Sequence, residues 1–186
     1  LIVLCVFLLV PSLLLAQGEV RVTVEGVQGE ELDNVRVALT VRTGLVKDGV
    51  VNERWLRRFE GQIPEKARQA LEPFGFYGAV VTVSSEVSGQ GVHEVRVLID
   101  PGEPVRVASV NVAVTGAGSR EEKLAEIIPA FPLREGATLR HDLYENGKND
   151  IRKKALELGY LDAGFTTHEI HVDPGKRTAT IELVLQ

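Results

Sequence analysis

The sequence contains no methionine and only one cysteine among its 186 residues. That cysteine, Cys5, lies in an uncharged apolar leader, residues 1–16, so the rest of the chain has no disulfide and no thiol chemistry. The leader is interrupted by Pro11 and is shorter than the roughly 20 apolar residues of a membrane-spanning helix. It is therefore predicted to be a signal peptide, with an uncleaved anchor as the alternative. The missing methionine and basic start indicate that this signal peptide is N-terminally incomplete.

The chain also lacks a strong net charge and the common catalytic motifs. It has 21 Lys and Arg against 26 Asp and Glu, a formal net charge of −5. This mild acidity argues against nucleic acid or an anionic membrane surface as the main partner. No nucleophile elbow, Walker or dinucleotide-binding pattern occurs. Basic clusters at 54–58 and 152–154 are expected to be solvated helix faces. Export without cysteines in the mature protein is typical of the Gram-negative periplasm.

The histidines offer few candidates for a metal site. His168 and His171 do not form the H-E-x-x-H pattern, and on a strand they would lie on opposite faces. His141 and Glu145 are one helical turn apart and could share a metal, but no third ligand is evident. We therefore predict that the chain is not an enzyme and holds no metal or cofactor.

What the sequence does contain is a repeat. Gly75-Phe76-Tyr77 follows one predicted helix, and Gly159-Tyr160-Leu161 follows another about 85 residues later. Each of these glycines is expected to be a left-handed cap at its helix end. Gly26, which ends the first predicted strand, and Tyr144, within the second of these helices, complete the set of residues taken as a structural signature.

The first copy reads as strand, helix, helix, strand, strand. Alternating valines give its first strand the period of a half-buried strand. Asn52 is expected to cap the second helix, and Pro64 to interrupt that helix near Gly61. The expected elements are a strand over 19–25, helices over 30–41 and 52–71, and strands over 79–87 and 92–99.

The second copy repeats the same order. Ser119 with Glu122 is predicted to form a capping box at the start of its first helix. The expected elements are a strand over 105–115, helices that begin at Ser119 and Thr138, and strands over 164–172 and 178–185. Between the copies, residues 100–104 contain two prolines, which predicts a short, stiff connection. The sequence thus predicts two α+β domains, 19–100 and 103–186, each a small sheet covered on one face by two helices.

Two such βααββ units behind a signal peptide resemble POTRA domains, the periplasmic modules of the outer-membrane assembly superfamily. The resemblance is closer to the first two POTRA domains of the TamA-like translocation and assembly subunits, and it covers nearly all of residues 19–186. The segments that carry it are Val22–Gly26, Leu32–Arg36, Ala70–Leu71, Phe74–Tyr77, Pro101–Val105, Tyr144–Lys148 and Gly159–Asp162. It implies two tandem POTRA domains on the periplasmic side of the outer membrane, followed in the whole protein by a third POTRA domain and a 16-stranded β-barrel.

The resemblance also implies partners. A TamB-like partner anchored in the inner membrane would dock on the first domain, and unfolded outer-membrane β-barrel precursors or autotransporters would be the clients. The family's strand order, 1-3-2, leaves the second strand at an edge, where another chain can add a strand. The candidate binding residues are therefore Ala79, Val80, Val81, Thr82, Val83, Phe165, Thr166, Thr167 and His168.

Two other hypotheses keep the same fold. The domains would serve only as a rigid spacer or docking arm, with residues 100–104 fixing the angle between them. Alternatively, they would form a periplasmic small-ligand binder, which requires a polar-lined pocket that the sequence does not indicate.

Overall fold

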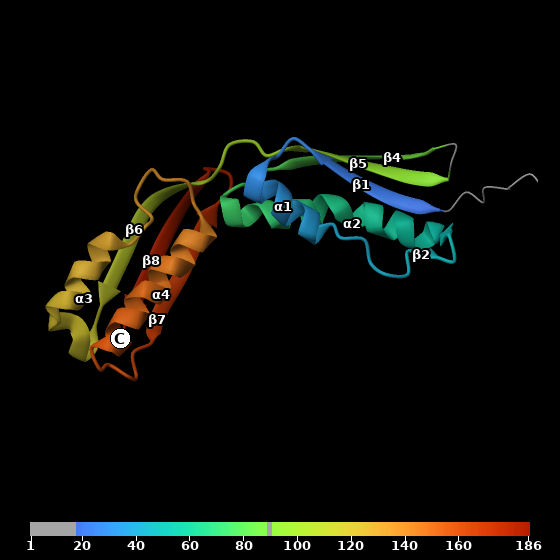
Figure 1. Ribbon diagram of the computed structural model, residues 1–186. Helices are drawn as coiled ribbons and strands as arrows, with labels where there is room; N and C mark the ends of the chain where they lie inside the picture. The colour runs from blue at the N-terminus through green and yellow to red at the C-terminus, as the bar shows by residue number, and fades with distance from the viewer. Residues whose placement is uncertain (1–17, 89–90) are drawn as a thin grey trace, which may run out of the picture.

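The computed structural model describes residues 18–88 and 91–186, and the predicted signal peptide lies outside these ranges. The described chain has a mixed α+β fold in which the order strand, helix, helix, strand, strand occurs twice (Figure 1). Each copy forms its own three-stranded sheet. The predicted fold class is therefore confirmed. No helix within the described ranges is long and apolar enough to span a membrane.

The first sheet has the strand order β1-β5-β4. β5 (Val92–Asp100) is the central strand, parallel to β1 (Glu19–Glu25) and antiparallel to β4 (Val80–Val87). Valines at every second position of β1 are partly buried and pack on the core, as the alternation predicted. A small hairpin, β2 (Val46–Lys47) and β3 (Val50–Val51), lies between the two helices of this unit.

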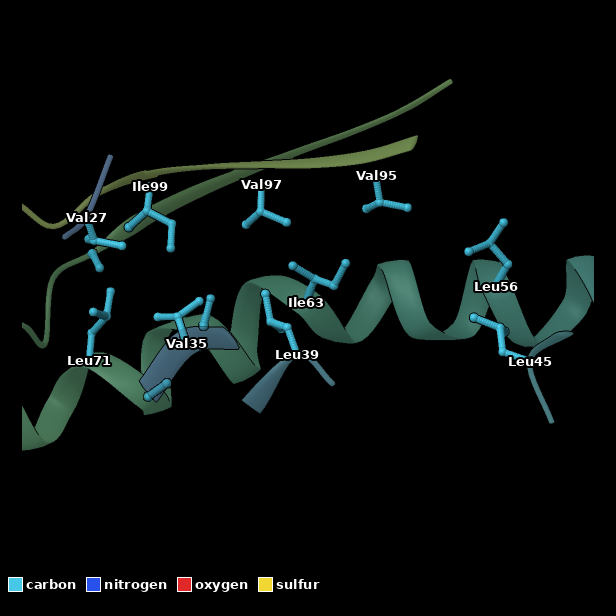
Figure 2. Close-up of a cluster of buried hydrophobic side chains, with 13 residues drawn as sticks. Val27, Val35, Leu39, Leu45, Leu56, Ile63, Leu71, Val95, Val97 and Ile99 are labelled. Carbon is cyan, nitrogen blue, oxygen red and sulfur yellow. The ribbon is translucent and has the colours of Figure 1, made fainter. Parts of the chain in front are cut away.

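Two helices cover one face of this sheet. They are α1 (Gly29–Ala38) and α2 (Glu53–Leu71), and a short 3-10 helix, η1 (Glu72–Phe74), extends α2. The predicted cap of α2 is confirmed, since Asn52 Oδ1 accepts a hydrogen bond from the Trp55 amide at 3.2 Å. Figure 2 shows Val95, Val97 and Ile99 of β5 pointing toward the side chains of α2. This contact between sheet and helix is the centre of the first core.

The predicted break in the second helix is wrong. α2 is a single helix of 19 residues with Pro64 in its interior. A proline at such a position costs about 3 kcal/mol, because it removes one helical hydrogen bond and crowds the preceding turn. Ile63 and Ala67, on either side of it, are fully buried. Tertiary packing on both sides of Pro64 therefore offsets the local cost and keeps the helix continuous.

The second sheet has the order β6-β8-β7. Its strands are β6 (Arg106–Val114), β7 (Phe165–Asp173) and β8 (Thr178–Leu185), with β8 in the centre. Its helices are α3 (Glu122–Ile127), α4 (His141–Glu157) and the 3-10 turns η2 (Gly116–Arg120) and η3 (Ile128–Ala130). The predicted capping box is wrong: Ser119 lies inside η2, and α3 begins after Glu121 with no side-chain cap. The glycines before Ser119 let the chain close a 3-10 turn first.

The buried side chains form two separate clusters, one under each sheet. The first contains Ile63, Leu71 and Val97, among others, and the second contains Ile151 and Leu183. Tyr77 belongs to the first sequence repeat but packs against the second cluster. Each copy of the repeat thus has its own hydrophobic core.

We expect each half of the chain, residues 19–100 and 103–186, to fold when expressed alone. Each half contains its own sheet and its own core, so little apolar area is lost when they are separated. Amide NMR spectra of each half should be dispersed. Collapsed spectra for both halves would show that the division into two domains is wrong.

Candidate functional site

The β4 strand forms a regular, unshared edge of the first sheet. Its register against β5 runs without interruption from Val80 opposite Asp100 to Val87 opposite His93. Within the described residues no strand pairs with its other side. Val81 and Val83 pack against the core, while the side chains of Val80 and Thr82 are exposed. Ala79 is buried just before the strand begins. Five of the predicted binding residues are thereby brought together along one edge.

The opposite edges of both sheets are partly covered. In the first sheet, Gly18 donates its amide to the Gly49 carbonyl at 2.8 Å, so the β2–β3 hairpin lies beside the start of β1. In the second sheet, the Val107 amide donates to the Ala137 carbonyl, and the Gly136 amide donates to the Val107 carbonyl. A loop therefore pairs with the start of β6. The β4 edge of the first sheet and the β7 edge of the second sheet are therefore more open to another chain than the β1 and β6 edges.

The β7 edge is less regular than the β4 edge. A β-bulge interrupts its register between Phe165 and Thr167. Thr166, the bulged residue, donates its hydroxyl to the Val184 carbonyl at 3.3 Å. Further along the strand, His171 Nε2 lies 2.8 Å from Glu169 Oε2, and both side chains are exposed. His168 is also exposed. Bulges and charged side chains are devices that hinder edge-to-edge pairing. The four candidate residues of β7 therefore lie on a more hindered edge than those of β4.

The two domains meet at a joint formed by the end of η1 and the start of α4. The Val105 amide donates to the Gly75 carbonyl at 2.8 Å. Tyr77 Oη and His141 Nε2 are hydrogen-bonded at 2.8 Å. Burial raises the pKa of the Tyr77 hydroxyl, and the nearby Glu72 carboxylate adds to this effect. Signature residues of the first repeat thus connect it to the second.

Arg140 is the centre of this joint. Its guanidinium donates to Glu30 Oε2 of α1 at 2.7 Å and to both carboxylate oxygens of Asp142. It also lies 5.0 Å from the centroid of the Phe74 ring, in cation–π geometry. The hydrogen bond from Arg140 lowers the pKa of the Asp142 carboxyl and keeps it ionised. One side chain of the second domain therefore holds a helix and an aromatic ring of the first.

We expect Arg140→Ala to leave both domains folded and to widen the distribution of orientations between them. The substitution removes the link to Glu30 and the contact with Phe74, whereas neither core contains Arg140. Residual dipolar couplings measured for the two domains should no longer fit a single alignment tensor. Arg57→Ala is the matched control, because Arg57 pairs with Glu53 on the surface of α2, within the first domain. Equal alignment tensors in Arg140→Ala would show that the guanidinium does not fix the angle.

The signature glycines have the backbone conformation that was predicted. Gly75 and Gly159 lie at helix ends with φ of 91° and 92°. A Cβ atom on Gly75 would lie 2.7 Å from the Leu139 carbonyl oxygen, whereas none of the atoms considered lies within 4 Å of that position at Gly159. The aromatic signature residues serve packing: Phe76 packs on the first core, and Tyr144 and Tyr160 on the second.

The residues weighed for a metal site are engaged in other contacts. His141 is bonded to Tyr77, and Glu145 forms an ion pair with Lys148 at 2.7 Å. In residues 18–88 and 91–186, no three His, Cys, Asp or Glu side chains lie close enough to hold a metal together.

The sequence reasoning missed the joint and the bulge. Arg140 and Glu30 are 110 residues apart, and no local pattern signals their contact. In the rigid-arm hypothesis residues 100–104 fix the angle between the domains. Side-chain contacts of α1, η1 and α4 also contribute to it.

Comparison with known proteins gives a family match for each half of the chain. Residues 21–101 match the family model described as POTRA domain TamA domain 1, and residues 105–186 match the POTRA model described as surface antigen variable number repeat. Solved structures with similarity include POTRA domains 3–5 of BamA from Haemophilus influenzae, with 17% identity and a TM-score of 0.45. Another is POTRA domains 1–3 of Omp85 from Anabaena, with 17% identity and a TM-score of 0.41. The alignments cover 91% and 90% of this chain but only 65% and 59% of those chains.

Proposed function

We propose that this chain, which belongs to the POTRA family as two tandem domains with the first of the TamA type, binds extended segments of other polypeptides by strand addition. The observation that carries the proposal is the β4 edge: eight residues in regular register with one side unpaired within the described chain. Such an edge is a template for another strand. β4 is the principal site, and β7 beyond its bulge is the secondary one.

The binding energy expected at this edge favours weak binding of many different sequences over tight binding of one. A strand added along eight residues would make about eight main-chain hydrogen bonds, each worth about 1 kcal/mol net. Ordering the eight incoming residues costs about 1–2 kcal/mol each, so the main-chain hydrogen bonds do not favour binding by themselves. Affinity then depends on modest contacts with exposed side chains such as Val80 and Thr82. Binding of this kind is weak, reversible and tolerant of sequence, as handling of unfolded chains requires.

The proposed clients are unfolded outer-membrane β-barrel precursors, including autotransporters, because their segments are destined to become strands. The match of residues 21–101 to a TamA first domain supports a TamB-like, inner-membrane-anchored partner for the first domain. We place the chain on the periplasmic side of the Gram-negative outer membrane, reached through the proposed signal peptide. The whole protein is proposed to continue into a third POTRA domain and a β-barrel.

A surface of the second domain supports this continuation. Leu161 occupies the repeat position of Tyr77, which packs against the core of the following domain. Leu161 is instead 78% exposed. A further domain placed in the same relation would cover it.

A second candidate function is that of a rigid arm. The contacts of Arg140 and Tyr77 across the joint favour it, since they restrict the angle between the domains. The arm and the strand-addition hypotheses make different predictions for capture of partners.

A photo-crosslinking residue at Val80 tests the proposal in cells. Val80 is an exposed valine on β4, and Val37 on α1 is a matched exposed valine away from any sheet edge. Strand addition predicts that Val80 captures client precursors and that Val37 does not. Equal capture at the two positions would favour the rigid arm.

A further inference from the structure

A groove in the first domain is lined by side chains of α2 and of the segment that connects α1 to β2. The connecting segment runs beside α2 (Figure 1). The groove has a volume of about 350 Å³, and it is separate from the β4 edge. Trp55 and Phe59, one helical turn apart on α2, form its apolar wall. The Trp55 side chain is not part of the core: 52% of the residue is exposed, which is a large apolar surface to leave in water.

The segment between α1 and β2 packs closely against the Trp55 ring. Gly44 has a φ of 103°, and a Cβ atom there would lie 3.3 Å from Trp55 Cζ3. The loop backbone therefore approaches the edge of the indole ring closely and holds it in place. Leu45, next in the chain, is buried at the base of the groove. Gly44 and Leu45 therefore lie against the apolar wall.

Three of the four other lining residues are cationic. Arg42, Arg58 and Lys66 border the groove, and none of them pairs with a carboxylate within the described residues. By contrast, Arg57 and Arg68 of the same helix, which do not line the groove, pair with Glu53 and Glu65. Three uncompensated cations at one groove are notable in a chain whose net charge is −5. The local field there favours an anionic ligand.

The spacing of the charges indicates what shape of ligand fits. Arg58, Gln62 and Lys66 follow one another at intervals of four residues, so they form a row along α2. The two cations are about 12 Å apart along the helix axis. A single phosphate needs donors that converge on one point, whereas an extended peptide covers about 12 Å in four residues. A row of this length matches two carboxylates that are four residues apart.

We propose that this groove binds an extended acidic segment of a partner polypeptide. Carboxylates of the segment pair with Arg58 and Lys66, an apolar side chain between them packs on Phe59, and the end of the segment next to Arg58 lies against Trp55. The Gln62 amide lies between the cations, where it can hydrogen-bond the segment's backbone. The groove would contact the side chains of its ligand, whereas a sheet edge contacts mainly the backbone. It would therefore allow the first domain to recognise one particular partner. It does not depend on strand addition.

Trp55 is the only tryptophan of the chain, so its fluorescence reports directly on the groove. The probe is a blocked octapeptide with two glutamates four residues apart and a leucine between them, titrated into the full chain. A saturable change in emission is expected, and Arg58→Glu with Lys66→Glu should weaken binding about tenfold or more. Arg57→Glu with Arg68→Glu is the control, with the same change in charge on the same helix but outside the groove. It should leave binding within about twofold.

Equal weakening in both double variants, or equal binding of a peptide with glutamine for glutamate, would overturn the proposal. So would a response to phosphatidylglycerol vesicles without a response to the peptide, which would assign the groove to a lipid surface. Salt provides a measurement that needs no variant. Raising NaCl from about 50 mM to about 500 mM should weaken peptide binding severalfold, and binding that does not respond to salt would contradict the assignment.

Discussion

Gly26→Ala should destabilise the first domain by about 3 kcal/mol or more. Gly26 ends β1 with a φ of 98°, and a Cβ atom there would lie 1.8 Å from the Ile99 carbonyl oxygen. That oxygen belongs to the central strand, so it cannot move without breaking the sheet ladder. The cost combines left-handed backbone strain with a clash against fixed backbone. For a domain of this size, whose total stability is about 4–12 kcal/mol, much of the folded population would be lost.

Urea titration followed by Trp55 fluorescence measures this effect, because the single tryptophan lies in the first domain. Gly159→Ala is the matched control: its φ of 92° is similar, but no clash is found within 4 Å of its Cβ position. It should leave the Trp55 transition of the first domain unchanged. Urea titration followed by circular dichroism should show the second domain destabilised by only about 1–2 kcal/mol, from backbone strain alone. A first domain as stable in Gly26→Ala as in the unchanged chain would mean that β1 and β5 do not meet as described.

A proline that replaces an outward-facing amide of β4 should reduce partner capture about tenfold or more, while the first domain stays folded. Successive amides of an edge strand alternate between the ladder and the outside, so we expect different results from Thr82→Pro and Val83→Pro. The variant whose amide points outward loses one donor to the added strand and places a ring in its path. It should keep its circular dichroism spectrum and reduce photo-crosslinking from Val80 about tenfold or more.

Thr82→Val is the control for this experiment, since it changes the side chain and keeps the amide. It should capture clients as well as the unchanged chain does. Full capture by the folded proline variant that lacks the outward amide would exclude strand addition at β4 and leave the rigid arm as the better account.

The repeat and the valine alternation were sufficient to predict the fold, because both follow from local periodicity. Val20, Val22 and Val24 fall on the core side of β1, and Gly75 and Gly159 have positive φ, as their helix-end positions required. The break at Pro64 was a wrong prediction, since local propensity was overridden by burial of Ile63 and Ala67 around it. Whether the helix continues through Pro64 is determined by packing across the whole domain.

The site was less predictable than the fold. Strand order places β4 and β7 at edges, but only the structure reveals that Thr166 forms a bulge and makes the two edges unequal. The groove had no signal either: the basic cluster at 54–58 was expected to be a solvated face. In the structure the residues of this cluster differ in their surroundings. Arg57 pairs with Glu53 on the helix surface, whereas Arg58 lines the groove. Such differences depend on contacts between distant segments.

Hydrogen exchange of the β4 amides, with and without a peptide from the strand of an outer-membrane β-barrel precursor, tests strand addition most directly. An added strand protects only the outward amides of an edge, so the account predicts that every second amide from Val80 to Val87 exchanges more slowly when peptide is bound. The alternate amides, already bonded to β5, should be unchanged. Protection that is absent from β4, or that does not alternate along it, would contradict the account.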